Sequence, residues 1–406
     1  PPRSTLFPYT TLFRSLLWIS SPLIVWLINR PIVENIVPLN EDQVNLLRQV
    51  MRRTWGFFER FVGPEDHWLP PDHYQESPAG IIAHHTSPTN IGFLLTSTLA
   101  AYDLGYLDQL GLATRLINTI DTMDQLERFK GHFINWYDTL TLQPLLPRYI
   151  STVDSGNLAA SLIITAQACK TMSASPIFRW DLWQGYLDTL SNLSEILAGM
   201  RKAEFSKQVE EINLQIDAIR SEILSIRFQP ALWYPLFVKV SGSFWEDLSR
   251  CLMELVEVGR SAFDLDALRK LQEVAAQVER HHLAVRRTIL ELLPWIPLVE
   301  SSPALLHEEK YSKAMSALET DLPYNIAFGQ VHSHVKVALQ HVQILRNLLS
   351  EEDLNTISKS KLSLSSNGQH AKTADNWLDA LTEALKHADV NAGLLKAKFK
   401  RIISRT

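Results

Sequence analysis

AHHTSPTNIG, at residues 83–92, is a polar, turn-forming run between two apolar stretches that have helical spacing. Two further runs have the same character, namely GHFINWYDT at residues 131–139 and YISTVDSGN at residues 149–157. Each run ends where a helix is expected to begin, and its short polar side chains can cap the first backbone N–H groups of that helix. The candidate capping residues are Thr89 or Asn90, Asp138, and Asp154 or Ser155.

If the helices next to these runs are neighbours, the three loops meet on one face and form a pocket. That pocket would be lined by Trp, Tyr, His, Asn and Asp side chains. In a sugar-binding cleft, an aromatic face covers the apolar side of a pyranose, and short polar side chains bond to its hydroxyl groups. The three runs therefore predict a carbohydrate-binding site.

Together with GPEDHWLPPD at residues 63–72, the three runs resemble the start of the helical cyclisation domain of cyclic β-1,2-glucan synthases. The four motifs stand in the same order and with matching spacing, between about residues 53 and 172. That domain is similar to the glucoamylase-like (α/α)6 glycoside hydrolases. The resemblance implies that residues 40–176 form the first part of an (α/α)6 toroid. It also implies that the complete domain cuts and rejoins a linear β-1,2-glucan.

Two features differ from the family pattern. His85 stands where the family has an arginine, and an imidazole does not reproduce the five-donor planar fork of a guanidinium. The chain ends at Thr406, whereas the resemblance places the carboxylates that perform the chemistry further on. We therefore expect this chain to carry part of the glucan-binding cleft and to be inactive alone.

Composition excludes several other classes of protein. The chain has 406 residues, of which 46% are apolar, enough for a sizeable core. A net charge of −5 gives no sign of a nucleic-acid surface. Cys169 and Cys251 each lie in an apolar helical pattern, which favours buried thiols over a disulfide or a metal site. Glycine is scarce, and the composition is typical of a helical protein.

The N-terminal stretch has two parts. Residues 1–15 have no periodicity and resemble a translated sequencing adaptor, so we exclude them from fold predictions as non-native. Residues 16–28, LLWISSPLIVWLI, are apolar but shorter than the roughly 20 residues that a membrane-spanning helix needs. A core helix or a signal peptide is one interpretation. The resemblance implies another, a truncated transmembrane segment at residues 16–30. In that interpretation, the positive charge of Arg30 is consistent with the segment leaving a bacterial inner membrane on its cytoplasmic side.

Helical spacing continues through the rest of the matched region. Residues 42–62 predict the first helix of the soluble domain, which a Gly-Pro pair ends. Long and short connections alternate between helices, as is typical of an α/α toroid, whose long loops gather on one face. Further helices are predicted at residues 89–104, 111–129 and 158–172.

The pattern changes after residue 176. Residues 177–360 predict an inserted helical bundle, in which residues 201–228 form an amphipathic, coiled-coil-like helix. Residues 361–374 are rich in Ser and predict a linker before one or more helices at residues 375–406. The predicted fold class is thus all-α: an incomplete (α/α)6 toroid, followed by an inserted amphipathic bundle and preceded by the end of a transmembrane helix.

Glycosyl transfer with retention requires two carboxylates about 5–5.5 Å apart. The acidic residues of the matched loops are Asp72, Glu76, Asp138 and Asp154. Asp138 is the best candidate within the chain, although we expect it to bind substrate hydroxyls and the catalytic pair to lie beyond Thr406. Helix capping is the alternative role for Asp138 and Asp154. Trp68 has a similar alternative, because single aromatics in such loops often serve as packing residues.

The resemblance assigns the remaining side chains of these loops to substrate binding as well. The complete predicted set is Trp68, Asp72, His84, His85, Thr86, Ser87, Asn90, Asn135, Trp136, Tyr137, Asp138, Asp154, Ser155 and Asn157.

Metal and nucleotide sites are not predicted. The histidines and acidic residues of the loops do not follow the helical His-x-x-x-His or His-Glu-x-x-His spacing that zinc enzymes use. Neither glycine-rich phosphate-binding pattern occurs. We therefore expect no metal and no cofactor in this domain.

The leading hypothesis is a fragment of a membrane-bound cyclic β-1,2-glucan synthase, a glycosyltransferase and transglycosylase as the complete protein. Its expected partners are a β-1,2-glucan chain, the membrane and the remaining domains of the same synthase, with no nucleic acid. Two alternatives remain open. One is a β-1,2-glucan hydrolase, and the other is a non-catalytic helical scaffold.

Overall fold

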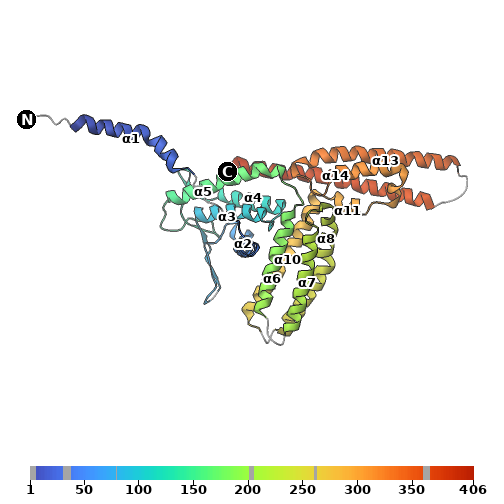
Figure 1. The fold of residues 1–406 in the computed structure, drawn as a ribbon, viewed down its shortest axis with the longest axis horizontal. Helices are drawn as coiled ribbons and strands as arrows, with labels where there is room; N and C mark the ends of the chain where they lie inside the picture. Colours follow the sequence, from blue (N-terminus) through green and yellow to red (C-terminus); the bar gives the residue numbers. More distant parts are fainter. Residues whose placement is uncertain (1–5, 31–37, 79, 201–204, 260–262, 360–365) are drawn as a thin grey trace, which may run out of the picture. The chain divides into compact units, whose positions relative to one another are not determined.

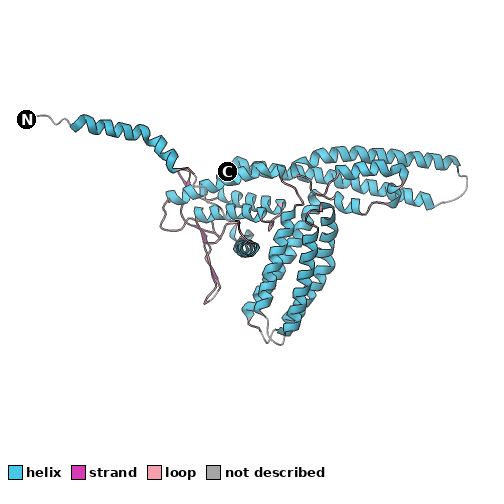
Figure 2. Ribbon diagram, in the orientation of Figure 1, coloured by secondary structure: helices cyan, strands magenta, loops and turns pink. Residues whose placement is uncertain are grey.

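The computed structural model describes residues 6–30, 38–78, 80–200, 205–259, 263–359 and 366–406. The chain is all-α, as the sequence predicts, and Figure 2 shows that helices make up nearly all of its regular structure. The described strands form three short antiparallel pairs. Two compact units are distinguished, Pro1–Leu47 and Arg48–Thr406.

The first unit contains α1 (Leu6–Ile28), and α2 (Glu41–Phe61) begins in it. Helix α1 is longer than the apolar run at residues 16–28, because the preceding residues 6–15 continue the same helix. Thr11–Ile28 is long and apolar enough to cross a membrane, as judged by length and composition, and none of it is buried. A signal sequence near an N-terminus meets the same criterion.

Helix α2 matches the predicted range closely and ends in the second unit, where α3 (Pro88–Asp103), α4 (Gln109–Met123) and α5 (Thr152–Thr171) follow. Helix α3 packs against both α4 and α5. The predicted helix at residues 111–129 ends earlier, at Met123. Beyond it, β4 (Arg128–Phe129) and β5 (His132–Phe133) form a hairpin. Lys130 and Gly131 both have positive φ, as the tight two-residue turn between twisted strands requires.

The predicted helix caps are corrected by the structure. Ser87, not Thr89 or Asn90, caps α3: its Oγ accepts a hydrogen bond from the Asn90 backbone N–H at 3.2 Å. Pro88 occupies the first helical position, where its missing N–H costs nothing. Ser151 caps α5, so residues 154–157, which were expected to precede the helix predicted at residues 158–172, lie inside it. Asp138 belongs to a strand and caps no helix.

The predicted bundle consists of helices, and their apolar spacing explains how they pack. In α7 (Ser206–Ser225), one face buries Val209, Ile212, Ile216, Ile219 and Ile223, which recur every three or four residues. The other helices are α6 (Trp180–Gly199), α8 (Trp233–Lys239), α9 (Trp245–Gly259), α10 (Leu265–Leu292), α11 (Trp295–Glu300), α12 (Glu309–Asp321) and α13 (Val331–Lys359).

Two glycines allow the bundle to approach the α3–α4 turn closely. Gly105 has φ +83°, which a residue with a Cβ rarely adopts. A Cβ on Gly105 would collide with the backbone of Asp181, and one on Gly185 would collide with the backbone carbonyl of Gly105. The start of α6 and the turn after α3 are therefore in backbone contact.

The last helix, α14 (Ser366–Arg405), runs beside α13 and also contacts α4, α5 and α10 (Figure 1). Of the predicted linker at residues 361–374, residues 361–365 lie outside the described residues, and the remainder belongs to α14. Arg401 and Arg405 form ion pairs with Asp121 of α4. One cluster of buried apolar side chains extends from Leu69 to Ile402, so the matched region and the bundle share a core.

Candidate functional site

Two of the three polar runs pair directly with each other. Strand β3 (His85–Thr86) is antiparallel to β6 (Tyr137–Asp138), with His85 opposite Asp138 and Thr86 opposite Tyr137. One residue further on, the Thr139 backbone N–H donates to the His84 carbonyl at 3.0 Å. Residues separated by about fifty positions in the sequence are thereby fixed side by side.

The third run joins them at the start of α5. Thr89 Oγ1 donates to Asp154 Oδ1 at 2.5 Å, and Asn157 Nδ2 donates to Thr89 Oγ1 at 3.2 Å. One orientation of the Asn135 amide gives both its nitrogen and its oxygen hydrogen-bond partners. In it, the nitrogen donates to Asp154 Oδ2 at 2.9 Å. In that orientation its oxygen accepts from Tyr149 Oη at 2.8 Å and from Trp136 Nε1 at 3.0 Å. Asp154 thus connects all three runs.

Three aromatic rings form a row along the edge of this cluster. The His85 ring lies edge-on to Trp136, with centroids 5.2 Å apart, and edge-on to His73, with centroids 6.3 Å apart. Trp136 is half-buried, and 36% of the His85 side chain is exposed. The indole therefore keeps accessible surface while the hydrogen bond from Nε1 to Asn135 fixes its orientation.

Asp72 lies at the same edge. Its Oδ1 accepts from Asn90 Nδ2 at 2.9 Å, its Oδ2 is 2.9 Å from His73 Nδ1, and His85 Nε2 is 3.9 Å away. Burial alone would raise the pKa of Asp72, but the hydrogen bonds of His73 and Asn90 and the charge of His85 together lower it. The carboxylate is therefore ionised and acts as a hydrogen-bond acceptor.

Asp138 has a local role that the sequence did not predict. Its Oδ1 accepts from the backbone N–H groups of Leu140 at 2.9 Å and Thr141 at 2.7 Å, and from Thr141 Oγ1 at 3.0 Å. Burial alone would raise its pKa, yet these bonds and the nearby charge of His84 together bring the pKa below its ordinary value. An ionised carboxylate that organises a turn is a poor general acid at neutral pH.

Asp66 lies beneath the cluster and was not among the predicted site residues. It is 7% exposed, and its Oδ1 accepts from Thr139 Oγ1 and lies 2.8 Å from His84 Nδ1. His67 Nδ1 is 2.9 Å from the Thr139 carbonyl. The buried carboxylate thus sets the orientation of His84. In the sequence, the feature that points to Asp66 is its position within the motif at residues 63–72.

Several predicted site residues do not face the accessible edge. Thr86, Ser87 and Tyr137 are buried, and the Tyr137 hydroxyl donates to the Glu127 carbonyl at 2.6 Å. The Trp68 ring lies 6.0 Å from the Arg115 guanidinium of α4, and the Ser155 hydroxyl donates to the Ser151 carbonyl. The polar groups of Thr86, Ser87, Tyr137 and Ser155 are therefore enclosed or bonded within the fold, and Trp68 lies near α4.

The chain is 39% identical over 191 residues to the cyclic beta-(1,2)-glucan synthase NdvB of Rhizobium meliloti. This similarity confirms the resemblance to cyclic β-1,2-glucan synthases. The matched residues make up 47% of this chain and 7% of the length of the synthase. No family model matches the chain.

His85 stands where the resemblance implies an arginine, and the two side chains differ as hydrogen-bond donors. A neutral imidazole has a single N–H donor, whereas a guanidinium has five. The centroid of the His85 ring lies 5.2 Å from that of Trp136 and 6.3 Å from that of His73, so His85 extends an aromatic surface.

Further members of the cluster were missed by sequence reasoning. His73, Thr89 and Tyr149 all make hydrogen bonds that link the predicted residues. The sequence indicates Thr89 only as a candidate helix cap. His73 follows Asp72 directly, but adjacency alone does not indicate that its ring turns toward His85.

Proposed function

We propose that the chain is part of a membrane-bound cyclic β-1,2-glucan synthase and contributes part of the glucan-binding cleft of its transglycosylating cyclisation domain. The observation that carries this proposal is the convergence of the three polar runs on Asp154, with Trp136 and His85 at the accessible edge. The similarity to a synthase supports the same substrate class.

In this proposal, a glucose ring packs on the indole of Trp136, which Asn135 holds in place. The aromatic face covers the apolar C–H groups of the sugar, and its hydroxyl groups lie toward polar side chains. The ionised Asp72 accepts hydrogen bonds from hydroxyls, and the amide of Asn157, which is exposed, supplies a donor. The lowered pKa values of Asp72 and Asp138 suit binding better than proton donation.

The catalytic carboxylates belong, in the same proposal, to a part of the synthase beyond Thr406. This chain therefore binds glucan without cutting or rejoining it, and no metal or cofactor takes part. Helix α1 anchors the chain in the bacterial inner membrane, with the soluble part on the cytoplasmic side.

The proposal is tested by nuclear magnetic resonance of the indole N–H groups. The chain has 11 tryptophans, and Trp136→Phe identifies the resonance of interest by its disappearance. A linear β-1,2-gluco-oligosaccharide should shift the Trp136 resonance, because the sugar packs against that ring. A β-1,4-linked oligosaccharide of equal length serves as the control ligand. Shifts confined to tryptophans of the bundle, such as Trp233 and Trp245, would contradict the proposal.

A further inference from the structure

An open groove of about 1270 Å³ adjoins the candidate site. Its walls come from α2, α6, α10 and the segment at residues 72–76. Asp72 and His73 line the groove and also belong to the cluster around Trp136. The groove and the candidate site are therefore neighbours that share two residues.

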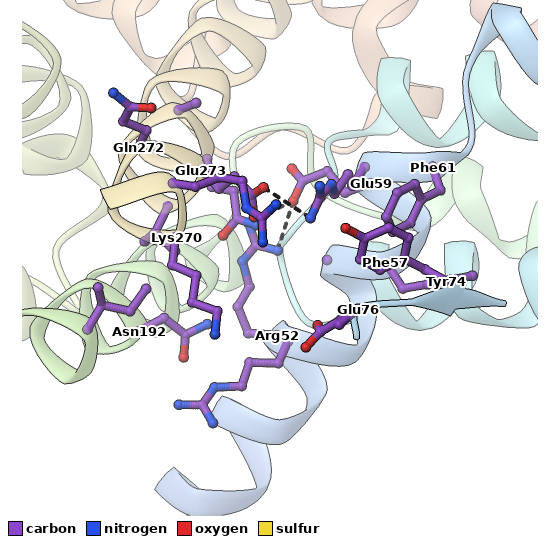
Figure 3. A pocket seen from close by; sticks show the side chains of 18 of the residues that line it. Arg52, Phe57, Glu59, Phe61, Tyr74, Glu76, Asn192, Lys270, Gln272 and Glu273 are labelled. Atoms are coloured by element: carbon purple, nitrogen blue, oxygen red, sulfur yellow. Dashed lines mark hydrogen bonds and ion pairs between the residues drawn. The ribbon is translucent and has the colours of Figure 1, made fainter. Parts of the chain in front are cut away.

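A second group of aromatic rings lines the groove. Phe57 and Phe61 of α2 have centroids 5.3 Å apart, and Phe61 and Tyr74 have centroids 4.8 Å apart. Tyr74 follows His73 in the chain, and His73 begins the row that leads through His85 to Trp136. Figure 3 shows Phe57, Phe61 and Tyr74 together at one side of the groove. All three rings are half-buried, so each retains accessible surface.

Polar groups lie across from these rings. Gln272, Glu273 and Lys270 of α10 lie at the opposite side in Figure 3. Asn192 of α6 also lines the groove. Asn192 is 5% exposed, and its Oδ1 has no hydrogen-bond partner among the residues that the structure describes. Asn192 thereby adds a buried amide to the polar wall of the groove.

The charges of the groove favour a neutral ligand. All six Arg and Lys side chains that line it already form ion pairs with carboxylates. These pairs are Arg52 and Arg280 with Glu59, Arg53 with Glu195, Arg60 with Glu273, and Arg269 and Lys270 with Asp266. An anionic ligand would have to compete with these carboxylates, whereas sugar hydroxyls can bond to the edges of such pairs without breaking them.

We propose that this groove is an extended glucan-binding site, in which the rings of Phe57, Phe61 and Tyr74 bind glucose units of a chain whose other end lies on Trp136. This inference rests on the proposed function. The groove adds length selectivity: a short oligosaccharide occupies only the Trp136 cluster, and a long one reaches the groove past His73 and His85.

The inference is tested by isothermal titration calorimetry of the full chain with a β-1,2-linked trisaccharide and dodecasaccharide. The wild-type chain should bind the dodecasaccharide more tightly. The double variant Phe57→Ala/Tyr74→Ala should weaken dodecasaccharide binding about tenfold, from two lost aromatic contacts, and leave trisaccharide binding unchanged. Gln272→Trp, at an exposed position, should obstruct the groove and give the same selective loss without removing packed side chains.

Matched controls are Phe228→Ala, which removes an aromatic ring that is 86% exposed outside the groove, and Trp136→Ala. Phe228→Ala should change neither affinity, and Trp136→Ala should weaken both. Retention of the wild-type length preference in the double variant and in Gln272→Trp would overturn the groove site alone. Absence of binding of either saccharide to the wild-type chain would overturn the proposed function together with this inference.

Discussion

At the scale of single residues, Asp66 ties two of the polar runs together. It is a buried acceptor for the Thr139 hydroxyl, which is fully buried, and it faces His84. Both partners come from polar runs distant in sequence. Loss of one buried partner leaves the other groups without a hydrogen bond, which costs more than the bond itself contributes.

Asp66→Ala should lower the free energy of unfolding by about 1–3 kcal/mol, because the Thr139 hydroxyl would remain buried without an acceptor. Urea denaturation measures this difference. The matched control is His73→Ala, whose side chain is 60% exposed and whose loss should change stability by about 0.5 kcal/mol or less. Equal effects of the two substitutions would show that Asp66 has no special structural role.

At the scale of elements, α1 differs from the helices of the second unit. Its 23 residues extend about 34 Å at 1.5 Å per residue, which exceeds the hydrocarbon thickness of roughly 30 Å. Leu23 and Trp26 are each more than half exposed. Exposed apolar side chains also occur on helices of the second unit, as Val390 and Leu394 do on α14.

Leu23→Arg/Trp26→Arg should move the chain from the membrane fraction to the soluble fraction, because each central arginine costs about 2.5–3.5 kcal/mol on insertion. Fractionation of expressing cells followed by immunoblotting measures the distribution. Val390→Arg/Leu394→Arg adds the same charges to exposed positions of α14 and should leave the distribution unchanged. If the α1 variant remained with the membrane, the anchoring role proposed for α1 would be refuted.

At the scale of the whole molecule, His282 makes folding depend on pH. It is 6% exposed in the bundle core, packed against Tyr186 of α6 and Trp245 of α9. Neither ring nitrogen has a hydrogen-bond partner among the described residues. Burial lowers its pKa from 6.5 to about 4, so the folded chain holds the imidazole neutral.

Between pH 6.5 and about 4, the unfolded chain binds a proton at His282 that the folded chain does not. Stability should therefore fall as the pH decreases through this window, by up to about 1.4 kcal/mol per pH unit from this residue. Urea denaturation at a series of pH values measures the slope. His282→Phe should reduce the slope, and His132→Phe, at an exposed position, should not. An unchanged slope in His282→Phe would contradict the assigned pKa.

Local patterns in the sequence determined the helical class, the extent of α2 and the buried stripe of α7. Helical periodicity is a property of neighbouring residues, so it can be recognised without knowledge of the rest of the chain. The motifs also located the polar runs that converge, and they led to the resemblance that the comparison confirms.

Only the tertiary structure decided which parts of those runs face outward. The pairing of β3 with β6 buried Tyr137 and exposed the edge of His85, and a shift of one residue would have reversed both. Ser87 and Ser151, rather than the predicted residues, cap α3 and α5. The role of Asp66 and the packing of His85 on Trp136 and of Phe61 on Tyr74 depend on contacts between distant segments. Such contacts leave no periodic signal in the sequence, because they are selected by packing in three dimensions.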